Sequence, residues 1–133
     1  MIKKVFKPFA WLIIFAVINF IAAGIGAFFD AEGVAKSGWG EGNILGLDGY
    51  YETTYGFMFT GISVIAAGLA FLTSGVQRAK MTVLFGVTMA LMIISVAVYS
   101  NAEGYSMGGP IILVPIALMS LVTLSGILHI KAE

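Results

Sequence analysis

Three polar side chains lie near the centres of long apolar stretches in this chain: Asn19, Ser63 and Ser120. If the facing ends of the first two stretches lie at the same depth in antiparallel helices, Asn19 is level with Ser63. A buried amide is costly in an apolar medium unless it is hydrogen-bonded. The sequence therefore predicts a polar contact between Asn19 and Ser63, which Ser120 could join.

Two interpretations of this polar contact remain open. It is either a structural cross-link between helices, or a ligand-binding site that orients the polar head of an apolar molecule. In the second case Asn19, Ser63 and Ser120 are the candidate ligand-binding residues, and a lipid or a quinone is the kind of ligand expected.

Asp48, Glu52 and Glu103 flank the apolar stretches and could bring carboxylates together. Carboxylate oxygens bind hard cations, and paired carboxylates can act as general acid and base. The spacing of the acids fits no recognised calcium loop, so the sequence predicts no metal site. The alternative is a cation site formed by these three acids. An enzyme that uses them is the least favoured hypothesis.

Catalytic groups are otherwise scarce. His129 is the only histidine, and the chain has no cysteine. A single histidine forms neither a metal triad nor a Ser-His-Asp arrangement. No acid or base lies near the middle of an apolar stretch, so a proton relay lacks its usual groups. The sequence predicts no catalytic residue, no cofactor and a protein that is not an enzyme.

The elements that position these residues are unusually apolar. Hydrophobic residues make up 59% of the chain and charged residues 11%. Four stretches contain no Lys, Arg, Asp or Glu: residues 8–29, 53–77, 81–102 and 104–130. Each is as long as the about 20 residues that a helix needs to cross a bilayer. The sequence predicts an all-α, four-helix transmembrane bundle within one domain, residues 1–133. The expected spans are residues 8–29, 54–76, 81–100 and 110–130.

The charges around these stretches are asymmetric. One side of the expected membrane receives nearly all the basic residues: Lys3, Lys4, Lys7, Arg78, Lys80 and Lys131. Basic residues favour the cytoplasmic side, which predicts cytoplasmic termini and an outside loop over residues 30–53. Residues 8–29 exceed the about 7–15 apolar residues of a signal peptide, so we expect a retained helix. A prokaryotic inner or plasma membrane is the expected location.

Small residues recur along the second stretch at helical spacing: Gly56, Thr60, Ser63, Ala67, Ala70 and Ser74. The first stretch has a shorter series of the same kind: Ala16, Asn19, Ala23 and Gly26. Small residues let helix backbones approach closely, and close packing is the main force between helices in lipid. These series predict that the first two helices form a tight, left-handed antiparallel pair.

Apolar and aromatic side chains also occur in and just after the outside loop: Trp39, Ile44, Leu45, Leu47, Tyr50 and Tyr51. Such side chains outside the membrane are suited to docking against a partner subunit. The zero formal net charge argues against nucleic acid as a partner. The expected partners are therefore the lipid bilayer and either other membrane subunits or further copies of the chain.

A family resemblance begins at residue 44. Leu45-Gly46-Leu47-Asp48 follows the first stretch, and Glu52 precedes Tyr55-Gly56 at the start of the second. With the basic turn and two further apolar stretches, this pattern resembles small four-helix DoxX-like membrane proteins, especially the uncharacterised DUF4345 group. That group commonly has an Arg before the Tyr-Gly pair and another in helix 3, whereas this chain has neither. The resemblance implies a four-helix bundle and no established reaction.

Two functions are compatible with these patterns. The favoured one is a non-catalytic accessory or structural subunit that packs in a larger membrane complex or a homo-oligomer. It rests on the missing catalytic groups, the small-residue series and the apolar residues of the outside loop. The alternative is the binding or transport of a lipid, quinone or other apolar small molecule within the bundle.

Overall fold

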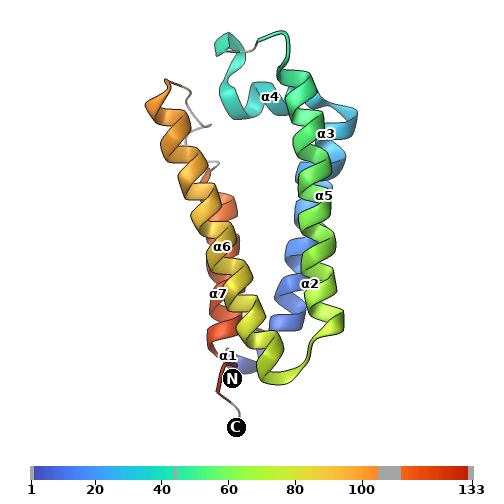
Figure 1. The fold of residues 1–133 in the computed structure, drawn as a ribbon, viewed down its shortest axis with the longest axis vertical. Helices are drawn as coiled ribbons and strands as arrows, with labels where there is room; N and C mark the ends of the chain where they lie inside the picture. Colours follow the sequence, from blue (N-terminus) through green and yellow to red (C-terminus); the bar gives the residue numbers. More distant parts are fainter. Residues whose placement is uncertain (1, 44, 105–111, 132–133) are drawn as a thin grey trace.

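The computed structural model describes residues 2–43, 45–104 and 112–131. The regular elements in these ranges are all helices, which confirms the all-α class. Figure 1 shows them in order along the chain. They are α1 (Ile2–Val5), α2 (Pro8–Asn19), the π-helix η1 (Phe20–Ile25), α3 (Gly26–Phe29), α4 (Ala31–Trp39), the 3-10 helix η2 (Glu41–Asn43), α5 (Asp48–Leu72), α6 (Gly75–Ala102) and α7 (Leu113–Ile127).

Three helices of the described residues are long and apolar enough to cross a membrane: Pro8–Phe29, Asp48–Leu72 and Gly75–Ala102. The first is the continuous run of α2, η1 and α3. Helix α7, which lies in the last apolar stretch of the chain, has 15 residues. At about 1.5 Å per residue, its length is about 22 Å. This is shorter than the about 30 Å of hydrocarbon in a bilayer.

The first expected span, residues 8–29, agrees with the structure. The helices in the other three expected spans begin and end at other residues. The span expected at residues 54–76 begins at Asp48 and ends at Leu72, and the one expected at residues 81–100 runs from Gly75 to Ala102. Charged residues marked the expected ends, but a helix can continue past the apolar region into polar surroundings. The span expected at residues 110–130 is helical over Leu113–Ile127, and residues 110 and 111 lie outside the described ranges.

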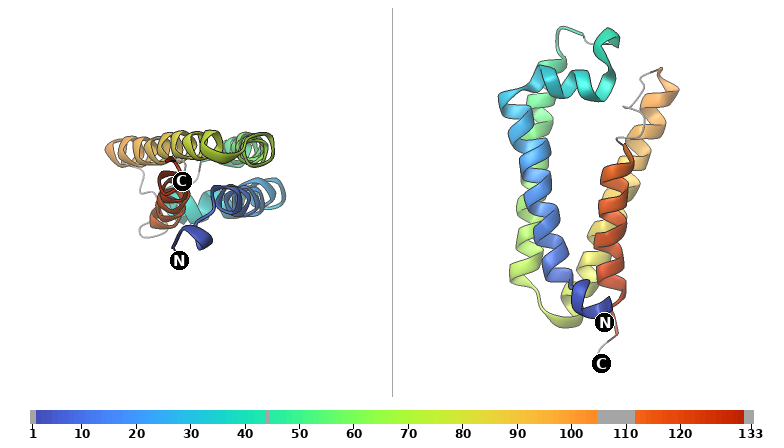
Figure 2. Two further views of the ribbon diagram at one scale, coloured as in Figure 1. Left: turned by 90° about the horizontal axis from the view of Figure 1, so that it is seen from below. Right: turned by 180° about the vertical axis from the view of Figure 1, so that it is seen from behind.

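The helices form two pairs, one of α2, η1 and α3 with α5, and the other of α6 with α7. The pairs meet at the end of the molecule that carries both termini, and they diverge toward α4 (Figure 1). Seen from below, α5 and α6 form one layer, and α2 and α7 form the other (Figure 2). This divergence creates the space in which the candidate site lies.

Glycines bring the helices of the first pair close together. A Cβ placed on Gly24 would lie 2.8 Å from Thr60 Oγ1, and a Cβ on Gly56 would lie 2.9 Å from the Ala27 Cβ. Distances below 3.0 Å leave no room for a side chain. The predicted tight antiparallel pairing of the first two helices is confirmed, with Gly56 and Thr60 of the predicted series at the contact. On the first helix the contact is made by Gly24 and Ala27 instead of the predicted Gly26, which faces Val34 of α4.

The second pair has similar contacts that the sequence analysis did not predict. A Cβ on Gly86 would lie 2.3 Å from Thr123 Oγ1, and a Cβ on Gly126 would lie 2.7 Å from the Ala79 carbonyl oxygen. Both glycines are buried. The backbones of α6 and α7 therefore approach each other as closely as those of the first pair.

A buried cluster joins the two pairs in the half of the molecule near the termini. The ring of Phe15 on α2 packs edge-on against Phe85 on α6, with centroids 5.2 Å apart. The fully or nearly fully buried members of the cluster are Leu12, Phe15, Ala16, Ala66, Ala70, Met89, Met119 and Val122. This cluster holds the two helix pairs together near the termini, whereas the pairs lie apart near α4.

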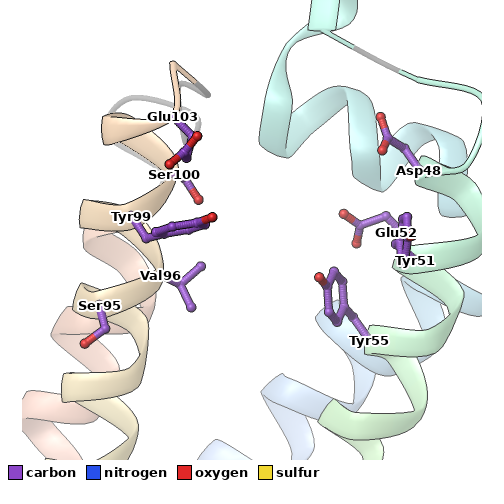
Figure 3. A pocket seen from close by; sticks show the side chains of 9 residues that line it. All are labelled: Asp48, Tyr51, Glu52, Tyr55, Ser95, Val96, Tyr99, Ser100 and Glu103. Atoms are coloured by element: carbon purple, nitrogen blue, oxygen red, sulfur yellow. The ribbon is translucent and has the colours of Figure 1, made fainter.

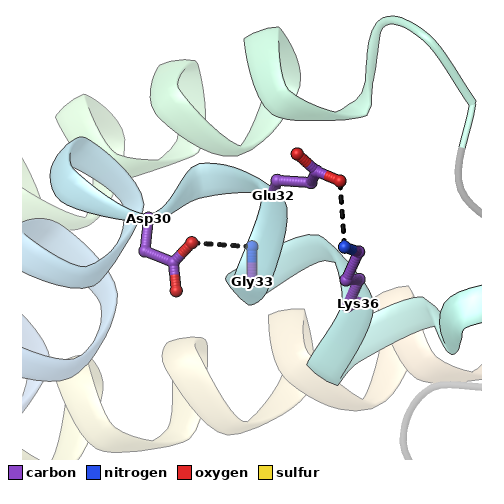
Figure 4. Close-up of polar contacts among 4 residues, drawn as sticks. All are labelled: Asp30, Glu32, Gly33 and Lys36. Carbon is purple, nitrogen blue, oxygen red and sulfur yellow. Dashed lines mark hydrogen bonds and ion pairs between the residues drawn. The ribbon is translucent and has the colours of Figure 1, made fainter.

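The segment predicted to lie outside the membrane, residues 30–53, contains the helix α4, which the sequence analysis did not predict. Asp30 caps α4, because its carboxylate accepts a hydrogen bond from the Gly33 backbone N–H at 3.1 Å. Lys36 and Glu32 form an ion pair one turn apart, at 2.9 Å (Figure 4). Ala35 is buried, so one face of α4 packs against the helices below it. The cap and the ion pair stabilise a helix despite the glycine content of the segment.

The Glu32 carboxylate raises the pKa of Lys36 above its ordinary 10.5, first through the hydrogen bond and then through its charge. A raised pKa means that the folded state holds the proton more tightly than the unfolded state does. The contribution of this ion pair to the stability of the folded state is therefore complete at neutral pH. It disappears only as the pH rises through the raised pKa of Lys36. The stability of α4 should not depend on this pair's titration between pH 6 and 8.

Replacing Asp30 tests the cap of α4. Asp30→Ala removes the acceptor for the Gly33 N–H and should destabilise α4 by about 1 kcal/mol. Hydrogen exchange at the Gly33 amide should become faster, while exchange within α5 stays unchanged. Asp30→Asn is the matched control, because its side-chain oxygen can still accept this bond. Equal exchange rates in the two variants would show that the cap does not hold α4.

Candidate ligand cavity

A cavity of about 390 Å³ lies between the two helix pairs. Phe15, Met89 and Met119 belong both to its lining and to the buried cluster, so the cluster closes one end. Val34 of α4 also lines the cavity. The lining is apolar except for Asn19. A concave apolar space with one polar group is the usual form of a site for an apolar small molecule.

Asn19 is held in a defined orientation at the wall of this cavity. Its Nδ2 donates hydrogen bonds to the Phe59 carbonyl oxygen and to Ser63 Oγ, both at 2.8 Å. The predicted contact between Asn19 and Ser63 is confirmed. A flipped amide would set Oδ1 against the Phe59 carbonyl, two acceptors with no proton between them, so the hydrogen bonds fix the orientation.

This orientation determines what Asn19 can offer a ligand. An amide nitrogen has two N–H donors, and both are used within the helix pair. The Oδ1 atom accepts no hydrogen bond from the residues that the structure describes. Asn19 therefore retains one acceptor beside an apolar cavity, which suits a ligand that carries a hydroxyl or an N–H.

A change in the helix follows directly after Asn19. Residues Phe20–Ile25 form the π-helix η1, in which the Gly26 N–H donates to the Ile21 carbonyl five residues earlier. Such π segments are rare and occur often at functional sites. Ala22 and Ala23 of this segment line the cavity. Their small side chains leave space there, while Gly24 on the same turn contacts Thr60.

Ser63 and Ser120 do not line the cavity. Ser63 is buried, and its Oγ both accepts from Asn19 and donates to the Phe59 carbonyl at 3.0 Å. Its role is to position Asn19. The prediction that Ser120 joins them is wrong, because Ser120 is exposed, donates to the Ile116 carbonyl and lines a separate groove beside Thr123. Its depth in α7 was estimated correctly, but it lies on another face of the helix.

A second cleft, of about 560 Å³, lies between α5 and α6 at their α4 ends. Asp48 and Glu52 on α5 face Glu103, the residue directly after α6, across it, as Figure 3 shows. No group of three His, Cys, Asp or Glu in the described ranges has the geometry to hold a metal ion. Val96 lines both this cleft and the apolar cavity. The cleft is therefore adjacent to the cavity, and carboxylates and hydroxyls lie among the tyrosine rings of its lining.

The residues predicted to dock a partner lie apart from the cavity. Leu45, Leu47 and Tyr50 are 61%, 63% and 67% exposed. Tyr51 is half-exposed and turns into the cleft between α5 and α6. Ile44 and the side chain of Trp39 lie outside what the structure describes. Three of the six residues thus form an exposed apolar surface at the start of α5.

Comparisons with protein-family models, with curated proteins and with solved structures found no match to this chain. The resemblance to DoxX-like proteins therefore stays a prediction. Sequence reasoning missed the cavity residue Ala22 and assigned Ala23 to the contact between the first two helices, whereas both line the cavity.

Proposed function

We propose that this chain is a non-catalytic membrane protein that binds an apolar small molecule in the cavity between its helix pairs. The observation that carries the proposal is one oriented amide in an otherwise apolar cavity. The ligand has an apolar body that fits about 390 Å³ and a donor that reaches Asn19 Oδ1. A hydroxylated lipid or a quinol meets these requirements, whereas a pure hydrocarbon gains nothing from Asn19.

The proposed arrangement in the membrane has four crossings and both termini in the cytoplasm. The basic residues near α1 and at the start of α6 support this orientation. It places α4 and the polar cleft on the outside of a prokaryotic inner membrane. A ligand could then reach the cavity from the outer leaflet or through the cleft beside Val96.

Filling the cavity tests the binding proposal. The wild-type protein, purified in a mild detergent, should retain one apolar molecule per chain, detected by organic extraction and mass spectrometry. Ala23→Phe should lose that molecule, because the ring occupies the cavity. Ser120→Leu is the matched control, since it adds bulk in the separate groove and should retain the ligand. Equal retention by both variants would exclude the cavity as the binding site.

A second candidate function, a subunit of a larger membrane assembly or homo-oligomer, is favoured by the exposed surface of Leu45, Leu47 and Tyr50. These residues precede or begin α5, beside the acidic residue Asp48, where an apolar surface would face water without a partner. Leu45→Glu with Leu47→Glu should release a partner chain that co-purifies with the wild type. The cavity ligand should stay bound in this double variant.

A further inference from the structure

A groove of about 820 Å³ lies at the opposite end of the molecule from α4. Six basic or potentially basic side chains line it: Lys3, Lys4, Lys7, Arg78, His129 and Lys131. None of the described residues that line it is acidic. Cations gathered in one groove repel one another, so an anion that enters it is attracted by all of them at once.

The groove also has an apolar side. Pro8 and Phe9 at the start of α2, together with Val76 on α6, line it beside the basic residues. The continuous run of α2, η1 and α3 and the helix α6 are each long enough to cross a membrane. In the proposed orientation, their first turns lie where hydrocarbon gives way to headgroups. A ligand that fits the groove therefore carries an anionic group next to an apolar part.

Arg78 is the most constrained of the cations. Its Nη2 donates to the Thr73 carbonyl oxygen, and its Cζ lies 5.3 Å from the centroid of the Phe9 ring. The Nε atom is buried and has no acceptor among the described residues. The guanidinium is therefore fixed at the groove, and since Nε is buried, its Nη donors outside the Thr73 bond are the ones that an incoming phosphate could use.

We propose that this groove binds the phosphate group of an anionic phospholipid. Lysines of α1 and the segment before α2 contact the phosphate from one side, and Arg78 and His129 contact it from α6 and the end of α7. The glycerol and the first acyl carbons lie against Phe9 and Val76. Bound lipid would thus connect the N-terminal segment to both helix pairs where they meet, independently of any ligand in the cavity.

Short-chain lipids in solution test this proposal with the full chain in detergent. Dihexanoyl phosphatidylglycerol should bind saturably in calorimetry, and dihexanoyl phosphatidylcholine should bind at least about tenfold more weakly, because it has no net negative charge. Sodium phosphate at the same concentrations should give no saturable signal, since it lacks the apolar part. Equal affinity for both lipids, or equal affinity for inorganic phosphate, would overturn the proposal of an anionic-lipid site.

Substitutions locate the site. Lys4→Gln with Lys7→Gln should weaken phosphatidylglycerol binding by about thirtyfold, since each Lys or Arg contributes about fivefold. Both lysines are exposed, so this variant should fold, and circular dichroism verifies that it does. Lys36→Gln with Lys80→Gln has the same net charge but leaves the groove intact. If both double variants lose affinity equally, overall charge accounts for binding and the groove is not the site.

Discussion

Gly126→Leu should strongly lower the free energy of unfolding, because it forces α6 and α7 apart. A Cβ at this position would lie 2.7 Å from the Ala79 carbonyl oxygen and 3.0 Å from the Val83 amide nitrogen. Both atoms belong to the backbone of α6, so rotation of a side chain cannot relieve the overlap. The helices must separate, at a cost of about 1–3 kcal/mol or more. Unfolding in detergent, followed by circular dichroism, measures it.

Gly61→Leu is the matched control for this substitution. Gly61 also lies within a long apolar helix, α5, but no atom lies within 4 Å of a Cβ placed there. Leucine should be neutral or stabilising at this position, because glycine is a poor helix former. If Gly126→Leu were as stable as Gly61→Leu, the close approach of α6 and α7 would be wrong.

Asn19→Leu should weaken binding of a hydroxyl-bearing ligand by about fivefold while leaving the fold intact. The substitution removes the Oδ1 acceptor from the cavity wall, and one hydrogen bond contributes about 1 kcal/mol. The protein should lose about 1 kcal/mol of stability or less, because Ser63 keeps its own bond to the Phe59 carbonyl. Calorimetric titration with a quinol of short chain length measures the change in affinity.

The corresponding quinone, which is the oxidised form of this quinol, is the control ligand. It has no donor for Oδ1, so Asn19→Leu should change its affinity little. Ser63→Ala gives a second comparison, since it removes one of the two acceptors that orient Asn19 and should have a smaller effect. If Asn19→Leu weakened both redox forms equally, the amide would be shaping the cavity without accepting a hydrogen bond.

The first helix pair could be predicted because its sequence signals depend on local spacing. An asparagine in an apolar helix requires a partner, and Ser63 on the small-residue series supplied one. Gly86 and Gly126 are equally important in the second pair, but isolated glycines do not identify the helix that they face. The depth of Ser120 followed from counting residues, whereas its face depends on how α7 is rotated against α6.

Helix α4 was missed although its signals were present. Asp30 at the N-cap and the i,i+4 pair of Glu32 and Lys36 are typical of a helix start, but the nearby glycines indicated a loop. The cavity had no such signal. It results from the angle between the two helix pairs, which depends on the whole cluster around Phe15 and Phe85.

Native mass spectrometry of the protein, after gentle extraction from its own membrane, tests ligand binding in the cavity most directly. Each chain should carry one apolar molecule, whose mass is lost in Ala23→Phe and kept in Ser120→Leu. Chains that emerge with stoichiometric protein subunits and no small molecule would contradict this prediction, and would favour the assembly role for the surface of Leu45, Leu47 and Tyr50.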